Sequence, residues 1–435
     1  MDAAARLLAS FHAALAAADP LTIVARHLPN WADLVTPDSR IIVIGAGKAA
    51  ASMAMAVERA WPDAPLEGLV VTRYDHGGPT TRIRVVEASH PVPDAAGEQA
   101  ARDMLALVES ARPHDLVLAL ISGGGSALLA LPVESVSADD LRAVTRELLR
   151  CGAPIGDINC VRKHVSRIAG GRLAQACAGR LIALAISDVA GDDLSAIASG
   201  PTVPDPTTFA DALHVLARWD VQAPQAVRAH LEAGTRGLVA ETPKASDPCF
   251  ARVQTQLIAS AQAMLEAAQA FWQTQHCDVL MLGEIEGEAR DVARAHAQLV
   301  SEHANARAHK TARPLAIVSG GECTVTVRGH GRGGRCSEYL LHLAIALDEL
   351  GLVDHVSALA CDTDGIDGSE NNAGAWFTPA HHARAKALGL DARVYANNND
   401  AYGYFSVLDA LITTGPTRTN VNDYRVILHT RAPHV

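Results

Sequence analysis

The sequence predicts an α/β fold with two domains and a parallel sheet in the N-terminal one. Short apolar runs alternate with helical segments along the first half of the chain, which is typical of βαβ units. Glycine-rich loops directly follow several of these runs. After a polar stretch the same alternation starts again, which indicates a second, smaller α/β domain.

Each predicted strand of the first domain is a short, continuous apolar run. Helical spacing and good helix formers over 48–61 and 94–111 separate some of these runs. Strands that alternate with helices in this way form a Rossmann-like parallel sheet. The predicted strands are 40–47, 68–72, 83–89, 115–122 and 180–187.

A polar stretch over 234–248, rich in Gly, Thr, Pro and charge, has the composition of a linker. We therefore expect domains at 1–238 and 239–435. Beyond this stretch the predicted strands are 253–260, 277–283, 314–327, 355–365 and 423–428.

Composition excludes several classes of protein. The net charge is −11 and no basic stripe occurs, so nucleic acid is not an expected partner. The eight cysteines form no CxxC pair, which argues against a zinc or redox motif and for reduced core thiols. Residues 1–20 lack the basic start of a signal peptide, and no window reaches about 18 uninterrupted apolar residues. We expect no membrane span and a cytoplasmic location.

The loop after the first predicted strand is the first candidate ligand site, because ligands of such sheets bind beyond the carboxyl ends of strands. Gly45 and Gly47 fit the loose dinucleotide pattern GxGxxA. The second strand ends in Thr72 and Arg73, without an acid for a ribose hydroxyl, so the pattern alone is weak. Lys48 stands at a helix start, where its charge opposes the helix dipole. That position favours an anionic ligand over a solvated lysine.

The loop Ser122-Gly123-Gly124-Gly125-Ser126 is a stronger signal. Three glycines after a buried strand let a ligand approach the backbone, whose N–H groups can hold phosphate oxygens. The alternative is a tight turn. No Gly-Lys-Ser/Thr follows, so this is not a Walker A loop.

Acidic and basic residues follow other predicted strands or precede helices. Asp188 and Asp192 follow the strand 180–187, where carboxylates could bind magnesium with phosphate or act as a general base. The alternative for this loop is a solvated turn or helix cap. Arg335 ends a glycine-rich stretch and suits bidentate recognition of carboxylate or phosphate. Asp364 and Asp367 lie in an acidic strand-end loop that lacks the glutamate of an EF-hand.

Taken in order, these loops resemble the class II glycerate 2-kinases, the family whose C-terminal part is called the MOFRL domain. The resemblance covers nearly the whole chain, and ten blocks in the right order are far more specific than any single loop. The blocks are VIGAGKAA (43–50), SHPVPD (89–94), SGGGSALL (122–129), INCVRKHVSRIAGGRLA (158–174), SDVAGDDLSAIASGPTVPD (187–205), GEAR (287–290), SGGECTVTVRGHGRGGRCSE (319–338), DTDGIDG (362–368), NDAY (399–402) and TGPTRTNVND (414–423).

The resemblance implies a two-domain α/β fold with the active site in the cleft between the domains. It implies phosphoryl transfer from ATP, with Mg²⁺ or another divalent metal, to the 2-hydroxyl of D-glycerate, which gives 2-phosphoglycerate. Lys48 and Arg335 match positions that this family turns toward the cleft, where Arg335 would bind the carboxylate of glycerate or a phosphate. Asp188 and Asp192 would divide metal binding and activation of the hydroxyl between them.

The expected nucleotide contacts come from both halves of the sequence. They are Gly45, Gly47, Ser122, Gly123, Gly124, Gly125, Ser126, Asp364 and Asp367. A homodimer is left open.

The chain departs from the family pattern at three positions, with Leu194 for a usual Pro, Cys336 for Asn and Arg418 for Gly. Members of the family often carry the name hydroxypyruvate reductase, so an NAD(P)H-dependent reductase is the first alternative. A non-catalytic sugar-acid-binding regulator is the second, although no segment is spare for an effector or DNA-binding region.

Overall fold

The computed structural model describes residues 2–306 and 313–430, which form two compact units. The large unit is Pro20–Ile258, and the small unit combines Met1–Asp19 with Ala259–Val435. We expected the domain boundary at 238/239, but the structure has this boundary 20 residues later, after Ile258. The reason is that strand β6 (Val253–Ala259) still pairs within the first sheet.

The large unit is built on a six-stranded sheet with the order β3-β2-β1-β4-β5-β6. The strands from β3 to β5 all pair in parallel, which confirms the predicted parallel sheet. Every residue of β1 and β4 is buried, as expected for central strands that are covered on both faces. The strands are β1 (Ile41–Ala46), β2 (Leu66–Arg73), β3 (Ile83–Ala88), β4 (Leu116–Ile121), β5 (Arg180–Ile186) and β6.

The order of these strands creates a topological switch point between β1 and β4. The sheet grows from β1 through β2 to β3 on one side, and from β4 to β5 on the other. Ligands of doubly wound sheets bind at the carboxyl ends of the strands at such a point.

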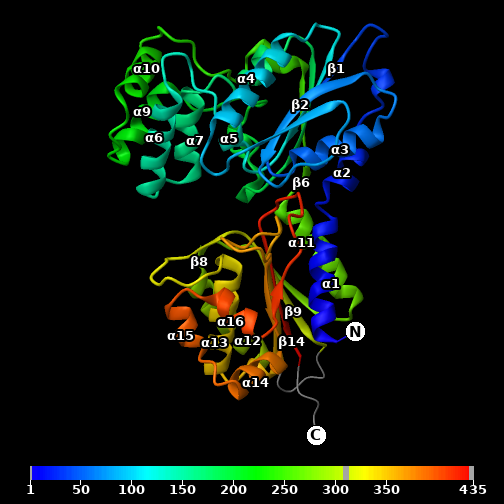
Figure 1. Ribbon diagram of the computed structural model, residues 1–435, viewed down its shortest axis with the longest axis vertical. Coiled ribbons are helices and arrows are strands. Elements are labelled where there is room, and N and C mark those ends of the chain that lie inside the picture. The colour runs from blue at the N-terminus through cyan, green and yellow to red at the C-terminus, as the bar shows by residue number, and fades with distance from the viewer. Residues whose placement is uncertain (1, 307–312, 431–435) are drawn as a thin grey trace. The chain divides into compact units, whose positions relative to one another are not determined.

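Helices of the large unit begin at recognisable caps. Asp94 accepts a hydrogen bond from the Gly97 N–H at the start of α4, and Ser137 and Asp140 form a capping box at the start of α6. Helices α6, α7, α9 and α10 pack around a core of their own beside the sheet (Figure 1). The helices are α2 (Pro20–His27), α3 (Ala50–Ala60), α4 (Ala95–Glu109), α5 (Gly125–Leu128), α6 (Ala138–Arg150), α7 (Ile155–His164), α8 (Arg172–Ala176), α9 (Phe209–Arg218) and α10 (Gln225–Thr235).

The small unit has a mixed six-stranded sheet with the order β13-β12-β11-β14-β9-β7. Within the described residues, β7 and β9 pair in parallel, and the pairs from β9 through β14, β11 and β12 to β13 are antiparallel. The strands are β7 (Asp278–Glu284), β9 (Leu315–Gly320), β11 (Val356–Asp362), β12 (Gly374–Phe377), β13 (Leu411–Ile412) and β14 (Asp423–His429). A separate two-stranded sheet pairs β8 (Gly287–Glu288) with β10 (Cys323–Thr324).

Helices cover both faces of this mixed sheet (Figure 1). Helices α1 and α11 pack together on one face, while α12 and α13 pack together on the other. The helices are α1 (Ala3–Ala16), α11 (Ala261–Thr274), α12 (Ala289–Ala306), α13 (Arg335–Glu349), α14 (Pro379–Ala387), α15 (Ala392–Asn397) and α16 (Ala401–Val407).

Among the described residues, one helical stretch, Ala3–His27, is long and apolar enough by length and composition to cross a membrane. This is weak evidence, because a core helix passes the same test. In the structure the stretch is two helices, and Leu7, Phe11 and Ala14 of α1 have no exposed surface. Helix α1 therefore packs its apolar side chains into the core of the small unit.

Candidate functional site

The loops that follow β1 and β4 meet at the switch point of the large sheet. The Lys48 N–H donates a hydrogen bond to the Gly123 carbonyl over 2.9 Å. The Ala49 N–H donates to Ser122 Oγ over 3.1 Å, and the Ser122 N–H donates to the Ala46 carbonyl over 2.9 Å. The structure therefore brings together Lys48 and the glycine-rich loop, two features that lie about 75 residues apart in the sequence.

Close packing between the two strands explains the first two glycines. A Cβ on Gly45 would lie 2.5 Å from the Leu120 carbonyl oxygen of β4, and a Cβ on Gly47 would overlap with Ser122. Gly47 also has a φ of +130°, which other residues rarely adopt. Both expected nucleotide contacts thus have a structural reason to be glycine, independent of any ligand.

Three polar side chains surround the glycine-rich loop. A Cβ on Gly123 would overlap with the Asp188 carboxylate, which follows β5. A Cβ on Gly124 would lie 3.1 Å from the His90 ring and 3.5 Å from Lys48 Cγ. We call Lys48, His90, Asp188 and the two glycines the strand-end cluster.

His90 belongs to a cluster that sequence reasoning only partly predicted. With 19 histidines in the chain, the residue type alone does not single out any one of them. The available signal was its position two residues beyond the end of β3, within the block SHPVPD.

Ser126 at the end of the loop joins a chain of buried polar groups. Its hydroxyl lies 2.8 Å from Ser199 Oγ, and Ser199 donates to Asn159 Oδ1 over 3.0 Å. Ser199 and Ala198 both have positive φ, at +60° and +49°. Strained backbone conformations of this kind persist only where the surrounding structure holds them in place, and they are often found at functional sites.

Asp192 lies on the same loop as Asp188 but takes a different conformation. Its φ is +56°, and its N–H closes a turn with the Val189 carbonyl. Within residues 2–306 and 313–430, no group of three or more His, Cys, Asp or Glu side chains is arranged to hold a metal ion. Magnesium that binds with phosphates needs only one or two carboxylates. Asp188 and Asp192 put two carboxylates on the loop that follows β5, which is enough for that requirement and leaves one of them for another role.

Arg335 begins α13 in the small unit, where carboxylates surround it. Its guanidinium lies 3.0 Å from Asp423, 2.8 Å from Asp362 and 3.2 Å from Glu322. Burial alone would lower the pKa of Arg335, but the negative charges of these carboxylates outweigh that effect and raise it. Asp362 and Asp423 are nearly inaccessible, whereas the Glu322 side chain is 56% exposed. Glu322 is therefore the partner that a ligand could replace at lowest cost.

Asp364 and Asp367 are buried within the small unit. Asp367 accepts hydrogen bonds from the Cys336 N–H (2.9 Å), the Ser337 N–H (2.8 Å) and the Ser337 hydroxyl (2.7 Å), so it caps the start of α13. Burial raises the pKa of Asp367 to about 6, against the opposing effect of these hydrogen bonds. Asp364 accepts from the Ile366 N–H within its own loop. We expected both to contact nucleotide, but their burial favours a supporting role.

Two of the three departures from the family pattern have clear structural settings. Arg418 has a φ of +60°, a left-handed conformation that glycine adopts without strain. This explains why glycine is usual there and why arginine is tolerated only at a cost. Cys336 is buried in the first turn of α13, and burial raises the pKa of its thiol well above its ordinary value.

Comparison with known proteins places this arrangement in a family. A family model described as a domain of unknown function (DUF4147) matches residues 6–232, and the MOFRL family model matches residues 315–423. A protein of Agrobacterium vitis named as a hydroxypyruvate reductase is 46% identical, over 96% of this chain and 92% of its own length. A protein of Pyrococcus horikoshii named glycerate 2-kinase is 40% identical, over 90% of this chain and 88% of its own length.

A solved structure agrees in both sequence and fold. The crystal structure of a glycerate kinase from Thermotoga maritima superposes with a TM-score of 0.84 at 34% identity, and the match covers 98% of this chain and 99% of that one. These findings confirm the predicted resemblance and fold class. The chain therefore belongs to the class II glycerate kinase family, in which a DUF4147 domain is combined with a MOFRL domain.

Proposed function

We propose that this protein is an ATP-dependent glycerate 2-kinase, which phosphorylates the 2-hydroxyl of D-glycerate and releases ADP and 2-phosphoglycerate. The observation that carries the proposal is the strand-end cluster. A lysine and a carboxylate lie against one glycine-rich loop at the switch point of the parallel sheet. Phosphoryl transfer requires mainly positioning and charge stabilisation, and this cluster has the groups for both.

Lys48 and the glycine-rich loop are assigned to the phosphates. Gly124 has a φ of +81°, and its lack of a side chain lets a ligand approach the backbone closely. The aliphatic part of Lys48 runs beside this glycine. Its ammonium group would stabilise the negative charge on the transferred phosphoryl group.

Asp188 is assigned to the acceptor hydroxyl. One of its carboxylate oxygens lies directly against Gly123, so it is placed beside the phosphate loop. There it would accept the proton of the 2-hydroxyl as the oxygen attacks phosphorus. A divalent cation bound with ATP would neutralise phosphate charge, and Asp192 on the same loop would hold it together with phosphate oxygens.

Arg335 is assigned to the carboxylate of D-glycerate. The substrate carboxylate would replace Glu322, which is the most exposed partner of the guanidinium. Asp362 and Asp423 would keep the guanidinium in place during this exchange. Bidentate pairing of arginine with carboxylate provides both orientation and specificity.

A hydroxypyruvate reductase is the second candidate, because the Agrobacterium vitis relative carries that name. Arg73, the last residue of β2, stands where an enzyme specific for NADH places an acid for the ribose. An arginine there would favour NADPH. The close packing that explains Gly45 and Gly47 weakens the dinucleotide interpretation further.

One assay set separates the candidates. The purified protein is incubated with D-glycerate, ATP and Mg²⁺ while ADP release is followed by a coupled assay. In parallel, it is incubated with hydroxypyruvate and either NADH or NADPH while absorbance at the nicotinamide band is followed. We expect ADP release that depends on D-glycerate, and no oxidation of either nicotinamide. Oxidation without ADP release would refute the kinase, and binding of D-glycerate without any turnover would favour the regulator.

We further propose a cytoplasmic location. All eight cysteines lie among the described residues and are free thiols. Seven of them are buried, which fits a chain that folds and stays in a reducing compartment.

A further inference from the structure

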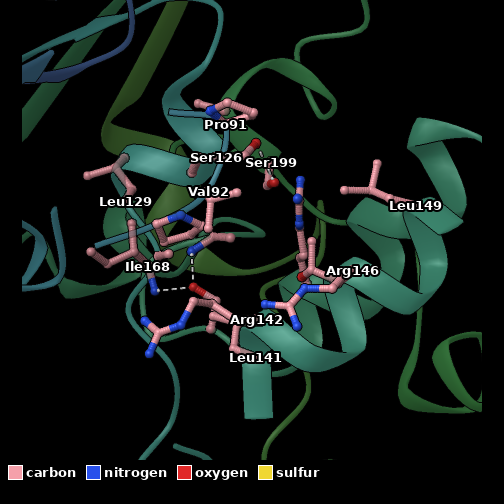
Figure 2. Close-up of a pocket in the computed structure, with 18 residues that line it drawn as sticks. Pro91, Val92, Ser126, Leu129, Leu141, Arg142, Arg146, Leu149, Ile168 and Ser199 are labelled. Carbon is pink, nitrogen blue, oxygen red and sulfur yellow. Dashed lines mark hydrogen bonds between the residues drawn. The ribbon is translucent and has the colours of Figure 1, made fainter. Parts of the chain in front are cut away.

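A cavity of about 100 Å³ lies in the large unit, beside the end of the glycine-rich loop. Ser126 and Ser199, which are hydrogen-bonded to each other, form part of its wall (Figure 2). Pro91 and Val92, directly after His90 of the strand-end cluster, form another part. The cavity therefore begins where the proposed phosphate loop ends, and the function proposed above gives it no role.

The lining combines apolar surface with positive charge. Val92 and Leu129 line one side and Leu149 the other, and Ile168 contributes further apolar surface (Figure 2). Three arginines also line it, and none of the lining residues that the structure describes is an aspartate or a glutamate. The arginines are Arg142, Arg146 and Arg162. Such a surface suits a ligand with an apolar body and an anionic group.

Arg162 on α7 is the unusual member of this set. Arg142 pairs with Asp139, but among residues 2–306 and 313–430 the guanidinium of Arg162 makes no hydrogen bond or ion pair. Burial lowers the pKa of Arg162 to about 10, without an opposing carboxylate. Arg162 is only half-buried, so a guanidinium with no carboxylate beside it in a mostly apolar cavity is available to pair with an anionic ligand.

We infer that this cavity binds the nucleoside end of the nucleotide and that Arg162 pairs with the phosphate oxygens nearest to it. The inference rests on the proposed function and names the place of one of its substrates. D-glycerate is too small and polar to use the apolar lining. A nucleotide combines a flat, weakly polar base with phosphates, and its phosphates would lead from Ser126 into the glycine-rich loop.

Direct binding of ADP tests the inference without relying on turnover. Isothermal titration calorimetry compares wild type with Arg162→Met, which keeps an unbranched apolar stem of similar length to that of arginine and removes the charged guanidinium group. We expect the Kd for ADP and the KM for ATP to rise about 10- to 100-fold, because a charged hydrogen bond is lost. The KM for D-glycerate should change little. The Tm of the unliganded protein should stay within a few degrees of the wild-type value, because Arg162 is only half-buried.

Arg150→Met is the matched control. Arg150 lies on α6, pairs with Glu147, and its side chain is 73% exposed outside the cavity. This variant should bind ADP as wild type does. An unchanged Kd for ADP in Arg162→Met would overturn the inference, and so would a rise confined to the KM for D-glycerate.

A second pair of variants avoids the buried position. Leu149 is 58% exposed at the cavity, so both Leu149→Gln and Leu149→Glu should fold. Leu149→Gln loses an apolar contact, and Leu149→Glu adds repulsion of the phosphates. We expect Leu149→Glu to bind ADP about fivefold more weakly than Leu149→Gln at low salt. Equal affinities would overturn the inference.

The controls also separate this inference from the proposed function. If wild type binds ADP but does not phosphorylate D-glycerate, the proposed acceptor is wrong while the cavity is still tested by the variants. If wild type phosphorylates D-glycerate and the cavity variants bind ADP normally, the function stands and the cavity assignment fails. If wild type does not bind ADP, both fail.

Discussion

The contact between the glycine-rich loop and Asp188 permits a sharp prediction for Gly123→Ala. A Cβ at this position would lie 1.8 Å from Asp188 Oδ2, whereas real Cβ atoms do not approach neighbouring heavy atoms within 3.0 Å. The carboxylate and the loop must therefore separate by about 1.2 Å. Because Asp188 is only half-buried, its side chain can move without unfolding the unit.

The displacement should affect catalysis far more than stability. Misplacement of a reacting group by about 1 Å can cost about 100-fold in rate, since the groups no longer meet in the productive geometry. We expect kcat to fall about 100-fold. The free energy of unfolding should change by about 1 kcal/mol or less, because Asp188 lies in a loop and contributes little to the core.

Steady-state kinetics and urea unfolding would measure the two effects. Gly156→Ala is the matched control, since a Cβ there meets nothing within 4 Å and should leave kcat unchanged. In an Asp188→Ala background, Gly123→Ala should reduce kcat little further, because both changes remove the same placed carboxylate. A Gly123→Ala protein with wild-type kcat would refute the assignment of Asp188, as would full additivity of the two changes.

Three further changes test other parts of the structure. Lys48→Ala should cut kcat about 100- to 1,000-fold with an unchanged circular dichroism spectrum, and near-normal turnover would exclude its role in charge stabilisation. Asp205→Asn should cost about 3–5 kcal/mol in urea unfolding, because it leaves the buried Lys163 without its 3.3 Å partner; a loss below 1 kcal/mol would contradict this. Burial lowers the pKa of His296 to about 4, so its folded form stays neutral and its contribution to stability, complete above pH 6.5, is lost as the pH falls toward 4. The free energy of unfolding of wild type should therefore fall by about 2–3 kcal/mol more than that of His296→Gln between pH 7.5 and pH 4.5. An equal fall in the two proteins would show that His296 is not kept neutral in the folded state.

The architecture of the large unit could be predicted because its central strands are continuous apolar runs. β1 and β4 are buried on both faces, so their sequences carry no polar alternation and are easily recognised. β12 and β13 were missed because they have four and two residues, too few for any periodic pattern. β6 was recognised as a strand, but no local pattern tells which of two sheets a strand joins.

The candidate site could be predicted only where a charged residue or a glycine-rich loop directly follows a strand. Lys48, the glycine-rich loop and Asp188 each follow one of three neighbouring strands, so their proximity is a consequence of strand order. Arg162 lies on α7, away from such positions, and only tertiary packing brings it to the cavity. His90 does follow β3 closely, but it is one of 19 histidines in the chain, so its residue type alone does not mark it.

The acidic loop of the small unit shows the opposite case. Asp364 and Asp367 follow β11 closely, and position alone suggested contact with ligand. The fold uses Asp367 to cap the start of α13 and Asp364 to support its own loop. The capping interaction joins residues 30 apart in the sequence, so no local pattern could show it.

The most direct test of the central claim is the identity of the phosphorylated product. Wild-type protein is incubated with D-glycerate, ATP and Mg²⁺, and the products are resolved by ³¹P nuclear magnetic resonance. We predict that 2-phosphoglycerate and ADP form in equal amounts and that Lys48→Ala slows the formation of both about 100- to 1,000-fold. Formation of 3-phosphoglycerate would contradict the predicted acceptor hydroxyl, and the absence of any phosphorylated product would contradict the kinase itself.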